Sequence, residues 1–489
     1  MNRQLFLAPA RLKHRHAATV APAAALVATL SAALLVSGCS FIPTYERPAA
    51  PVAASYPDQL VPVGAASAPG SAVAEIDWRD FFADPRLKRL IELSLQNNRD
   101  LRIAILNIEQ ARAAYQVRRA DQLPTVGAGA QAQRQAAGSG GLVNTYSVGL
   151  QITGYELDFF GRVRALSQSA LAQYLATEEA RKTAQISLIA GVATTYIGLL
   201  ADDEQLRVTR KTLTTREDSF RLTQLRFDNG ASSEVDLRQA EQLLETAKAT
   251  LAQTQRQHAI DENALTALVG QPLPVDLPAG LPLAAQQGVS ELPAGLPSDL
   301  LTRRPDVRGA EQQLLAANAN IGAARAAFFP KISLTTSAGT ASTELSGLFK
   351  GGSWAVTGSA SLLQPIFDAG RNRANLEIAK VGKDIAVAQY ERAIQTAFRE
   401  VSDSLAGRAT LGEQLRAQTA VANAAQASFR LADLRYRNGV SSYFDLLDAQ
   451  RTLFAAQLAT VQTQALQVQN AVALYKVLGG GWSEPVAAR

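Results

Sequence analysis

Acidic residues that follow two Asn-Gly pairs are the side chains best suited to chemistry in this sequence. Asp236 and Asp445 each lie six residues after the glycine of such a pair, and Asp448 lies three residues further on. Ser233 and Ser442 precede the first two acids by three residues, which is the capping-box pattern at the start of a helix. We favour capping for Asp236, whereas Asp445 can serve both as a cap and as a free carboxylate. Asp448 lies beyond the first turn, where capping does not explain an acid, and a free carboxylate attracts cations.

The only cysteine, Cys39, is the second candidate for chemistry. It follows a basic segment and the apolar residues 17–38, and the sequence around it is LLVSGCS. A leucine or valine, two small residues and a cysteine form the pattern that a lipoprotein signal peptidase requires. Residues 1–38 are therefore expected to be a signal peptide, and the thiol of Cys39 to carry diacylglycerol, with palmitate on the new N-terminus. Ser40 is not the aspartate of an inner-membrane retention signal. An ordinary signal peptide or a single membrane helix with an incidental cysteine is the alternative.

Composition argues against a nucleic-acid-binding protein. The chain has 48 basic and 43 acidic residues, for a net charge of +5, but residues 1–38 hold four of the bases and no acid. Without that leader, 44 bases face 43 acids, so the excess of positive charge belongs largely to the signal peptide. A basic surface that would bind nucleic acid is therefore not indicated.

The sequence offers no catalytic residues and no metal site. No cysteine and histidine residues have the spacing of metal ligands, and no glycine loop that would cradle phosphate follows a strand. His258 occupies a heptad position, where packing explains it better than metal binding. A single cysteine also excludes an internal disulfide. We therefore expect neither enzyme activity nor a cofactor other than the covalent lipid.

An internal repeat of the sequence places Asp236 and Asp445 at equivalent positions. Residues 222–240 and 431–449 share ten of nineteen residues at a constant offset of 209, including the Asn-Gly pairs and the acid at Asp236 and Asp445. The same offset aligns DFFGR at 158–162 with FDAGR at 367–371. A repeat of this length predicts two copies of one structural unit. The predicted divisions are a signal peptide (1–38), a lipidated tether (39–83), repeat 1 (84–270), a linker at mid-height (271–299), repeat 2 (300–479) and a C-terminal tail (480–489).

Each repeat contains one predicted strand hairpin, at about 124–156 and about 330–366. Apolar and small polar residues alternate in TYSVGLQIT (145–153) and in SWAVTGSASL (353–362), which is the period of a strand with two different faces. A soluble sheet over a core produces this pattern. A membrane barrel also produces it, with strands of about 9–11 residues. Alternation alone does not distinguish them.

A very long helix follows each strand hairpin. Residues 161–227 and 370–436 contain no proline, and a helix of that length spans about 100 Å. Leu206, Leu213 and Phe220 lie seven residues apart, a heptad seam that requires a partner helix. The chain is thus expected to form antiparallel helical hairpins over 206–269 and 415–478, with tip turns at 229–231 and 438–440. Residues 84–121 are expected to form a helix that is stacked end to end with the return helix 231–269.

Four strands do not close a barrel, because small barrels need about eight. A bilayer does not tolerate open sheet edges, so a membrane barrel would require several chains. Two chains would supply eight strands and three chains twelve. Side chains fill the interior of an eight-stranded barrel, whereas the serine, glycine, threonine and glutamine residues of these strands suit a wet interior. We therefore prefer three chains.

These features resemble the outer membrane factor (TolC) family, in the lipid-anchored NodT/OprM-like branch of RND-type efflux systems. The resemblance covers nearly the whole mature chain and includes RYRNGVSSYFDLLDAQ at 435–450, which is similar to the family's periplasmic tip. It implies a mainly α protein that forms a homotrimer, with a 12-stranded outer-membrane β-barrel continuous with a periplasmic α-helical barrel. It also implies an outer-membrane exit duct that docks to a periplasmic adaptor and an inner-membrane RND-type pump. A lipid-anchored coiled-coil scaffold or adaptor without a channel is the alternative function.

The resemblance also implies which residues close the channel at its periplasmic end. The family's aperture corresponds to Phe444, Asp445 and Asp448, with Arg451 as a candidate partner. In a trimer, the two acids of each chain would form a cation-selective constriction. Some members carry an arginine two residues after the tip glycine, where this chain has Ser441, so the bonds that restrain the tip must differ. The remaining implied positions are Tyr436 and Asp236 for the gate, and Asn229, Gly230, Ala231, Asn438, Gly439 and Val440 for contact with the adaptor.

Overall fold

The computed structural model describes residues 40–56, 76–136, 138, 140–286 and 303–482. The described residues form two compact units. The sheet unit takes its residues from 1–44, 116–169 and 318–381, and the hairpin unit from 45–115, 170–317 and 382–489. The predicted signal peptide, Cys39, part of the linker 271–299 and the end of the C-terminal tail lie outside the described residues.

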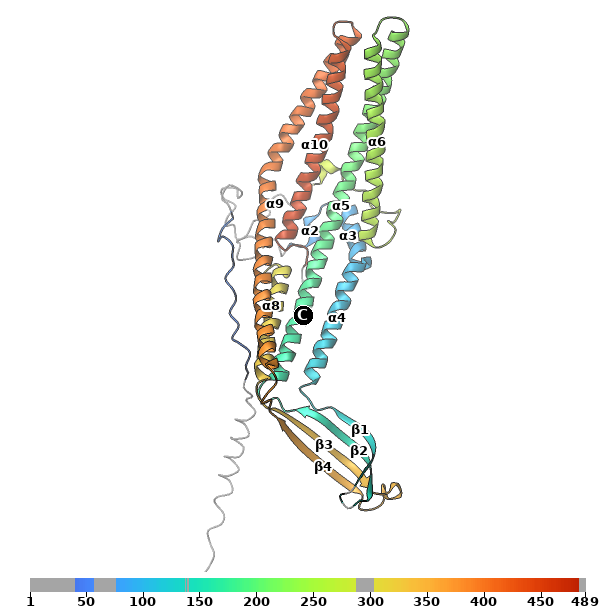
Figure 1. Ribbon diagram of the computed structural model, residues 1–489. Helices are drawn as coiled ribbons and strands as arrows, with labels where there is room; N and C mark the ends of the chain where they lie inside the picture. The colour runs from blue at the N-terminus through green and yellow to red at the C-terminus, as the bar shows by residue number, and fades with distance from the viewer. Residues whose placement is uncertain (1–39, 57–75, 137, 139, 287–302, 483–489) are drawn as a thin grey trace, which may run out of the picture. The chain divides into compact units, whose positions relative to one another are not determined.

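Two antiparallel helical hairpins dominate the hairpin unit (Figure 1). The long helices α5 (Arg162–Asp228) and α9 (Arg371–Arg437) have 67 residues each, and each precedes a shorter return helix, α6 (Glu234–Val269) or α10 (Tyr443–Val477). One part of α5 is long and apolar enough to cross a membrane by composition, but half of it is buried inside the chain, as in a core helix. The duplicated helical hairpins expected from the repeat are confirmed.

Both hairpins reverse at the predicted Asn-Gly turns. Gly230 and Gly439 have φ of 74° and 71°, a left-handed conformation that glycine adopts without a Cβ penalty. The N–H of Ala231 donates to the carbonyl of Arg226 at 2.7 Å, and the second turn repeats this bond at 2.9 Å. These bonds satisfy carbonyls at the end of each long helix.

The N-terminal helices α3 (Pro85–Asn97) and α4 (Arg99–Ala120) differ from the sequence expectation, which was a continuous helix over 84–121. Asn98 interrupts it in an extended conformation, with φ of −62° and ψ of 131°. Its side chain accepts from the N–H of Leu101 and donates to the carbonyl of Leu268, both at 2.9 Å. Asn98 therefore starts α4 and also joins the break to the end of α6. The end of α6 thus meets the break between α3 and α4, with α3 packed beside α6.

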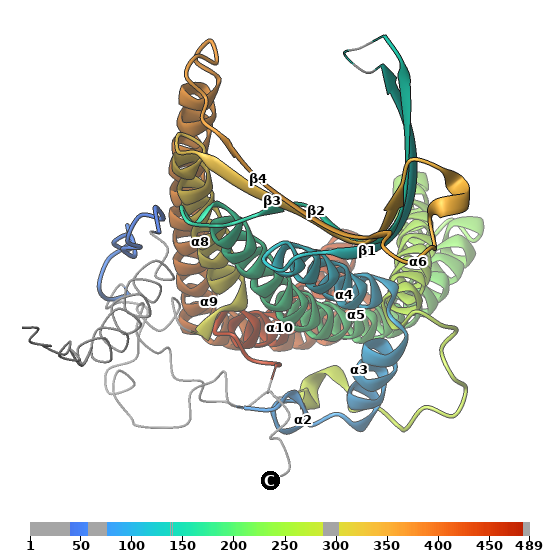
Figure 2. The same cartoon turned by 90° about the horizontal axis from the view of Figure 1, so that it is seen from below.

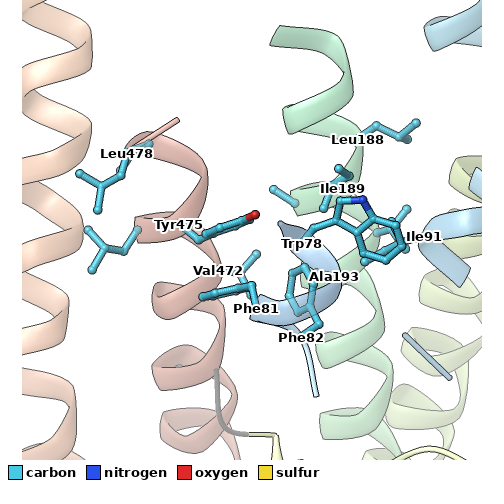
Figure 3. Close-up of a cluster of buried hydrophobic side chains, with 14 of the residues drawn as sticks. Trp78, Phe81, Phe82, Ile91, Leu188, Ile189, Ala193, Val472, Tyr475 and Leu478 are labelled. Carbon is cyan, nitrogen blue, oxygen red and sulfur yellow. The ribbon is translucent and has the colours of Figure 1, made fainter. Parts of the chain in front are cut away.

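An aromatic core lies where α2 (Trp78–Phe81) packs against α5 and α10 (Figure 3). The rings of Phe81 and Tyr475 stack with centroids 4.0 Å apart. The hydroxyl of Tyr475 donates to the carbonyl of Ile76 at 2.6 Å. Trp78 is 3% exposed beside them. Burial of aromatic side chains on this scale makes the cluster a main source of stability for the hairpin unit.

Asp84 connects three parts of the hairpin unit and has no exposed surface. It caps α3 by accepting from the N–H of Arg86 at 2.7 Å. It also accepts from the hydroxyl of Tyr196 on α5 at 3.1 Å and from the N–H of Leu281 at 2.9 Å. The amide of Gln286, just after the short 3-10 helix η3 (Leu283–Ala285), donates to the same carboxylate. One carboxylate thus fixes the described part of the linker to both α3 and α5.

The sheet unit contains one antiparallel sheet with strand order β1-β2-β3-β4, which curves strongly in Figure 2. The first repeat supplies β1 (Val126–Ala136) and β2 (Leu142–Glu156). The second supplies β3 (Lys331–Ser342) and β4 (Trp354–Leu363), with the 3-10 turn η4 (Leu345–Gly347) between them. β1 and β4 are the two edges, each paired on one side within the described chain. Four strands per chain are therefore confirmed.

The two faces of the sheet differ in chemistry. The strand register places Val126, Leu150 and Val356 on one face, where they are 61%, 57% and 65% exposed. Ser337 and Thr357 lie on the other face with their hydroxyls 2.6 Å apart. An apolar face of this kind needs a cover of lipid or protein, because a soluble chain rarely exposes so much apolar surface.

The first described residues of the chain pack on the end of α8 (Pro305–Ala326) in the sheet unit. The ring of Phe41 stacks on Phe329 with centroids 4.6 Å apart. The side chain of Asn318 donates to the carbonyl of Pro43 at 2.8 Å. A Cβ at Gly322 would lie 2.4 Å from Ile42, so only glycine leaves room for this segment. Residues 41–43, which begin two residues after Cys39, are thus packed against the end of α8 and the residues that follow it.

Candidate gate at the hairpin tips

The first two turns of α10 separate two sets of side chains. Phe444 is 62% exposed, and Asp445, Asp448 and Arg451 are exposed on the same side of the helix. Their spacing of one, three and three residues follows one face of a helix. The opposite face is buried and carries Tyr443, Leu446, Leu447 and Gln450. The four residues that the resemblance assigned to an aperture are therefore brought together on one exposed face.

Asp236 has the capping role favoured from its sequence. Its N–H donates to the hydroxyl of Ser233 at 3.1 Å, and its carboxylate accepts from the N–H of Ser233 at 3.2 Å. Both halves of the capping box are present, so this acid is used locally. In the second hairpin, the hydroxyl of Ser442 accepts from the N–H of Asp445 at 3.4 Å, and the carboxylate of Asp445 is exposed. The carboxylate of Asp236 is therefore used in capping, whereas the carboxylate of Asp445 remains available to other partners.

Tyr436 does not lie with the exposed acids. It is 6% exposed, its ring lies 5.2 Å from that of Tyr443, and the guanidinium of Arg226 lies 4.5 Å from its centroid. Tyr436 therefore belongs to the packing between the two hairpins, and its part in a gate stays a prediction.

The predicted adaptor contacts are exposed at both turns: Asn229, Gly230, Ala231, Asn438, Gly439 and Val440. Each asparagine side chain donates to a carbonyl of its own long helix at 2.7 Å, Asn229 to Leu225 and Asn438 to Leu434. The turns are thus well-ordered protrusions that a partner can contact, and their role in docking stays a prediction.

Sequence reasoning missed Arg216, Gln450 and Phe454, which join the hairpins behind the tips. Arg216 is 3% exposed and its guanidinium lies 5.0 Å from the centroid of Phe454. Gln450 donates to the hydroxyl of Ser219 at 3.0 Å. One signal was present, because the heptad through Leu213 and Phe220 puts Arg216 at the other core position of the seam, where a charge is unusual.

A second group of acids lies further along the first hairpin. Asp202 of α5 is 5% exposed, and burial together with the nearby carboxylate of Asp261 raises its pKa to about 6. His258 of α6 bonds to Asp203 at 3.1 Å, so the histidine has a packing and pairing role, as its heptad position indicated. Within the described residues, no three His, Cys, Asp or Glu side chains form a cluster suited to a metal ion.

Asp202→Asn is expected to make the hairpin unit more stable above pH 6. The carboxyl of Asp202 keeps its proton up to about pH 6 in the folded chain but only to about 3.8 when unfolded. The folded state therefore binds more protons between these values, and stability falls as pH rises from about 4 to about 6. The uncharged amide removes this loss, so the unfolding free energy at pH 7.5 should rise by more than about 1 kcal/mol. Urea unfolding across pH 4–8 measures it. An identical pH profile in both proteins would contradict the assignment, and exposed Asp276→Asn is the control.

Comparison with known proteins agrees with these features. The model of the family "Outer membrane efflux protein" matches residues 90–271 and 296–480. The chain is 48% identical over 459 residues to the solvent efflux pump outer membrane protein SrpC of Pseudomonas putida, covering 92% of this chain and 97% of that protein. It is 44% identical to the outer membrane protein OprJ of Pseudomonas aeruginosa, with 94% and 96% covered. The open-state structure of the MtrE outer membrane channel of Neisseria gonorrhoeae superimposes with a TM-score of 0.81, at 42% identity, covering 91% of this chain and 98% of that one.

These matches confirm the resemblance found in the sequence and the fold class that it implied. The solved channels of this kind are trimers, and their fold is that of the chain described above. The outer-membrane location, with an extension into the periplasm, and the role as the exit duct of a tripartite efflux system are supported by the same relatives. The chain therefore belongs to the outer membrane efflux protein family.

Proposed function

We propose that the chain conducts drugs or other toxic compounds passively, without catalysis, through a duct that is gated at the hairpin tips. The observation that carries the gate is the exposed face of α10, on which Asp445 and Asp448 lie unburied while the opposite face packs. Asp445 uses its N–H for capping and leaves its carboxylate free, and Asp448 is beyond the capping turn. Two free carboxylates per chain at one level can select cations when chains meet around an axis.

A homotrimer supplies that axis. The edge strands β1 and β4 each have one unpaired side in the single chain, and a bilayer does not tolerate unpaired backbone groups. Three chains would join these edges into a barrel of about twelve strands, wide enough to be wet inside. The polar face with Ser337 and Thr357 would then line the lumen, and the apolar face with Leu150 and Val356 would contact lipid. The same symmetry gathers the α10 faces of three chains.

Asp448→Ala is expected to reduce the cation-to-anion permeability ratio by at least about twofold, because one carboxylate per chain leaves the constriction. The reversal potential of the purified full-length protein in planar bilayers under a salt gradient measures this ratio. Glu413→Ala is the matched control, since this exposed acid of α9 pairs, among the described residues, only with Arg416 on its own helix. If Asp448→Ala leaves both selectivity and current at wild-type values, the acid ring is the wrong assignment.

We also propose that Cys39 carries diacylglycerol and palmitate that anchor the chain to outer-membrane lipid. The seat of residues 41–43 on α8 supports this proposal, because the lipid would enter the leaflet within two residues of Phe41. Two residues span at most about 7 Å, so the anchor would be held close to the base of the strands. The mass of the N-terminal peptide tests it, and an unmodified Cys39 peptide would exclude the lipid.

The partners proposed are a periplasmic adaptor at the exposed tip turns and an inner-membrane RND-type pump behind it. Relatives such as SrpC are named as outer membrane proteins of solvent efflux pumps, which supports a pump partner for this chain. The tips offer exposed turns that are flanked by charged side chains such as Asp228 and Arg437, so main-chain and charged contacts would both take part in the docking.

A further inference from the structure

One face of α5 lies against the second hairpin just behind the tips. Its residues 216, 219, 223 and 226 are three, four and three positions apart, which places them on one side of a helix. Thr223 is fully buried, and each of the other three has a partner across the hairpins. The three pairs, called the ladder below, are Arg216 with Phe454, Ser219 with Gln450, and Arg226 with Tyr436.

Arg216 is the most unusual member of the ladder. It is 3% exposed and donates from Nη1 to the carbonyl of Leu243 at 2.8 Å, while its Nε has no hydrogen-bond partner among the described residues. No carboxylate of the described chain pairs with it. Burial and the nearby charge of Arg451 both lower its pKa. A buried cation without an acid is costly to folding, so packing alone does not explain its presence.

Arg226 repeats this chemistry nearer the tip. Its guanidinium lies 4.5 Å from the ring centroid of Tyr436, and that ring contacts Tyr443 at 5.2 Å. Within the described residues it also has no carboxylate partner. A guanidinium over the face of an aromatic ring is attracted by the ring electrostatically, without a carboxylate partner. Both arginines therefore reach across from α5 to aromatic rings of the second hairpin.

The ladder determines which way α10 faces. Tyr443, Gln450 and Phe454 lie on the α10 face that packs against α5, and Leu447 between them is 1% exposed. With that face held, the acids at 445 and 448 and Arg451 must lie on the other side. Rotation of α10 would break the contact between Arg216 and Phe454. Arg226 holds Tyr436 of α9, whose ring packs on Tyr443 of α10, so this second contact restrains α10 through the pair of rings.

We propose that Arg216 and Arg226 are positioning residues that set the aperture of the tip, through cation–aromatic contacts between α5 and the second hairpin. This inference rests on the proposed gate. Loss of one contact should release α10 and raise the fraction of time that the tip is open.

The test is the open probability of the full-length protein in planar bilayers, with thermal stability measured in parallel. Arg226→Gln and Arg216→Met are each expected to raise open probability by about threefold to tenfold. Arg216→Met should leave the melting temperature unchanged or higher, since replacing a buried charge by an apolar residue is often neutral or stabilising. Arg226→Lys keeps a cation over the ring and should restore much of the closed state.

Arg221→Gln is the matched control. It lies on α5 between the two positions, carries the same charge and is exposed. Within the part of the chain that the structure describes, it pairs only with Asp218 of its own helix. Its open probability should equal that of the wild type. If Arg226→Gln and Arg216→Met also behave as wild type, or if Arg221→Gln matches them, the positioning role is overturned while the duct remains. No current from the wild type and all variants would overturn both the duct and the ladder.

Discussion

Gly149→Val is expected to lower the amount of folded protein in the outer membrane to about a tenth of wild type or less, because overpacking of a tight site costs about 1–3 kcal/mol or more. Gly149 of β2 faces Gly339 of β3 in the strand register. A Cβ added at Gly149 would lie 2.5 Å from the carbonyl oxygen of Ala338 and 2.7 Å from Cα of Gly339. The obstruction is backbone, so no rotamer change relieves it.

The two glycines belong to a line of small residues that crosses the sheet. Gly129, Gly149, Gly339 and Ala355 are paired in turn across the four strands. A line without large side chains lets the backbones of β2 and β3 approach closely at Gly149 and Gly339. Valine at Gly149 would push β2 and β3 apart at this line, and strand pairing would fail on both sides of it.

Gly127→Val is the control that separates the backbone clash at Gly149 from the general effect of replacing a strand glycine. Gly127 lies two residues from Gly129 on the same face, and a Cβ there would meet only the carbonyl oxygen of Gln151, at 4.0 Å. Its folded yield should match the wild type, because valine favours strands. Quantitative blotting of detergent-extracted trimer after gel filtration measures the yield. Equal yields of Gly149→Val and Gly127→Val would show that the close approach is not required.

Asp84→Ala is expected to reduce the free energy of unfolding of the hairpin unit by about 3–5 kcal/mol. The substitution removes the cap of α3, which contributes about 0.5–2 kcal/mol. It also leaves the hydroxyl of Tyr196, the N–H of Leu281 and the amide of Gln286 without their acceptor, and each unsatisfied buried group costs about 1–3 kcal/mol. The linker should detach before the helices unfold.

Urea unfolding followed by tryptophan fluorescence measures this change, because Trp78 is buried in the adjacent core. Asp276→Ala is the control, since this acid is exposed in the same linker and should change stability by less than about 0.5 kcal/mol. A loss below about 1 kcal/mol for Asp84→Ala would mean that water replaces the lost carboxylate and that the carboxylate does not hold the linker.

The repeated architecture could be predicted from sequence because its signals are local and occur twice. Proline-free runs gave the two 67-residue helices to within one residue at each end, and the Asn-Gly pairs located both turns. The capping of Asp236 followed from Ser233 three residues earlier. Alternation in residues 145–153 and 353–362 identified strands whose faces the register confirms.

Features that depend on contacts between distant segments could not be predicted in the same way. The break at Asn98 lies in a sequence that favours helix, and it is held by the carbonyl of Leu268 from another helix. Tyr436 was grouped with the gate acids, but the helix beside it, with Arg226, determines that it is buried. The buried cation of Arg216 gave a weak signal, because a single charge in a heptad seam has no visible partner in the sequence.

The strands themselves are expected to span the outer membrane, and fractionation of a protein without its lipid anchor tests this. The chain would be secreted with an ordinary cleavable signal peptide in place of residues 1–38 and with Cys39→Ser, so that no lipid and no leader remains. This protein should stay in the outer-membrane fraction and be released only by detergent, because its apolar sheet face contacts lipid. Release into aqueous buffer by salt or alkaline washing would contradict the channel and favour a lipid-anchored periplasmic scaffold.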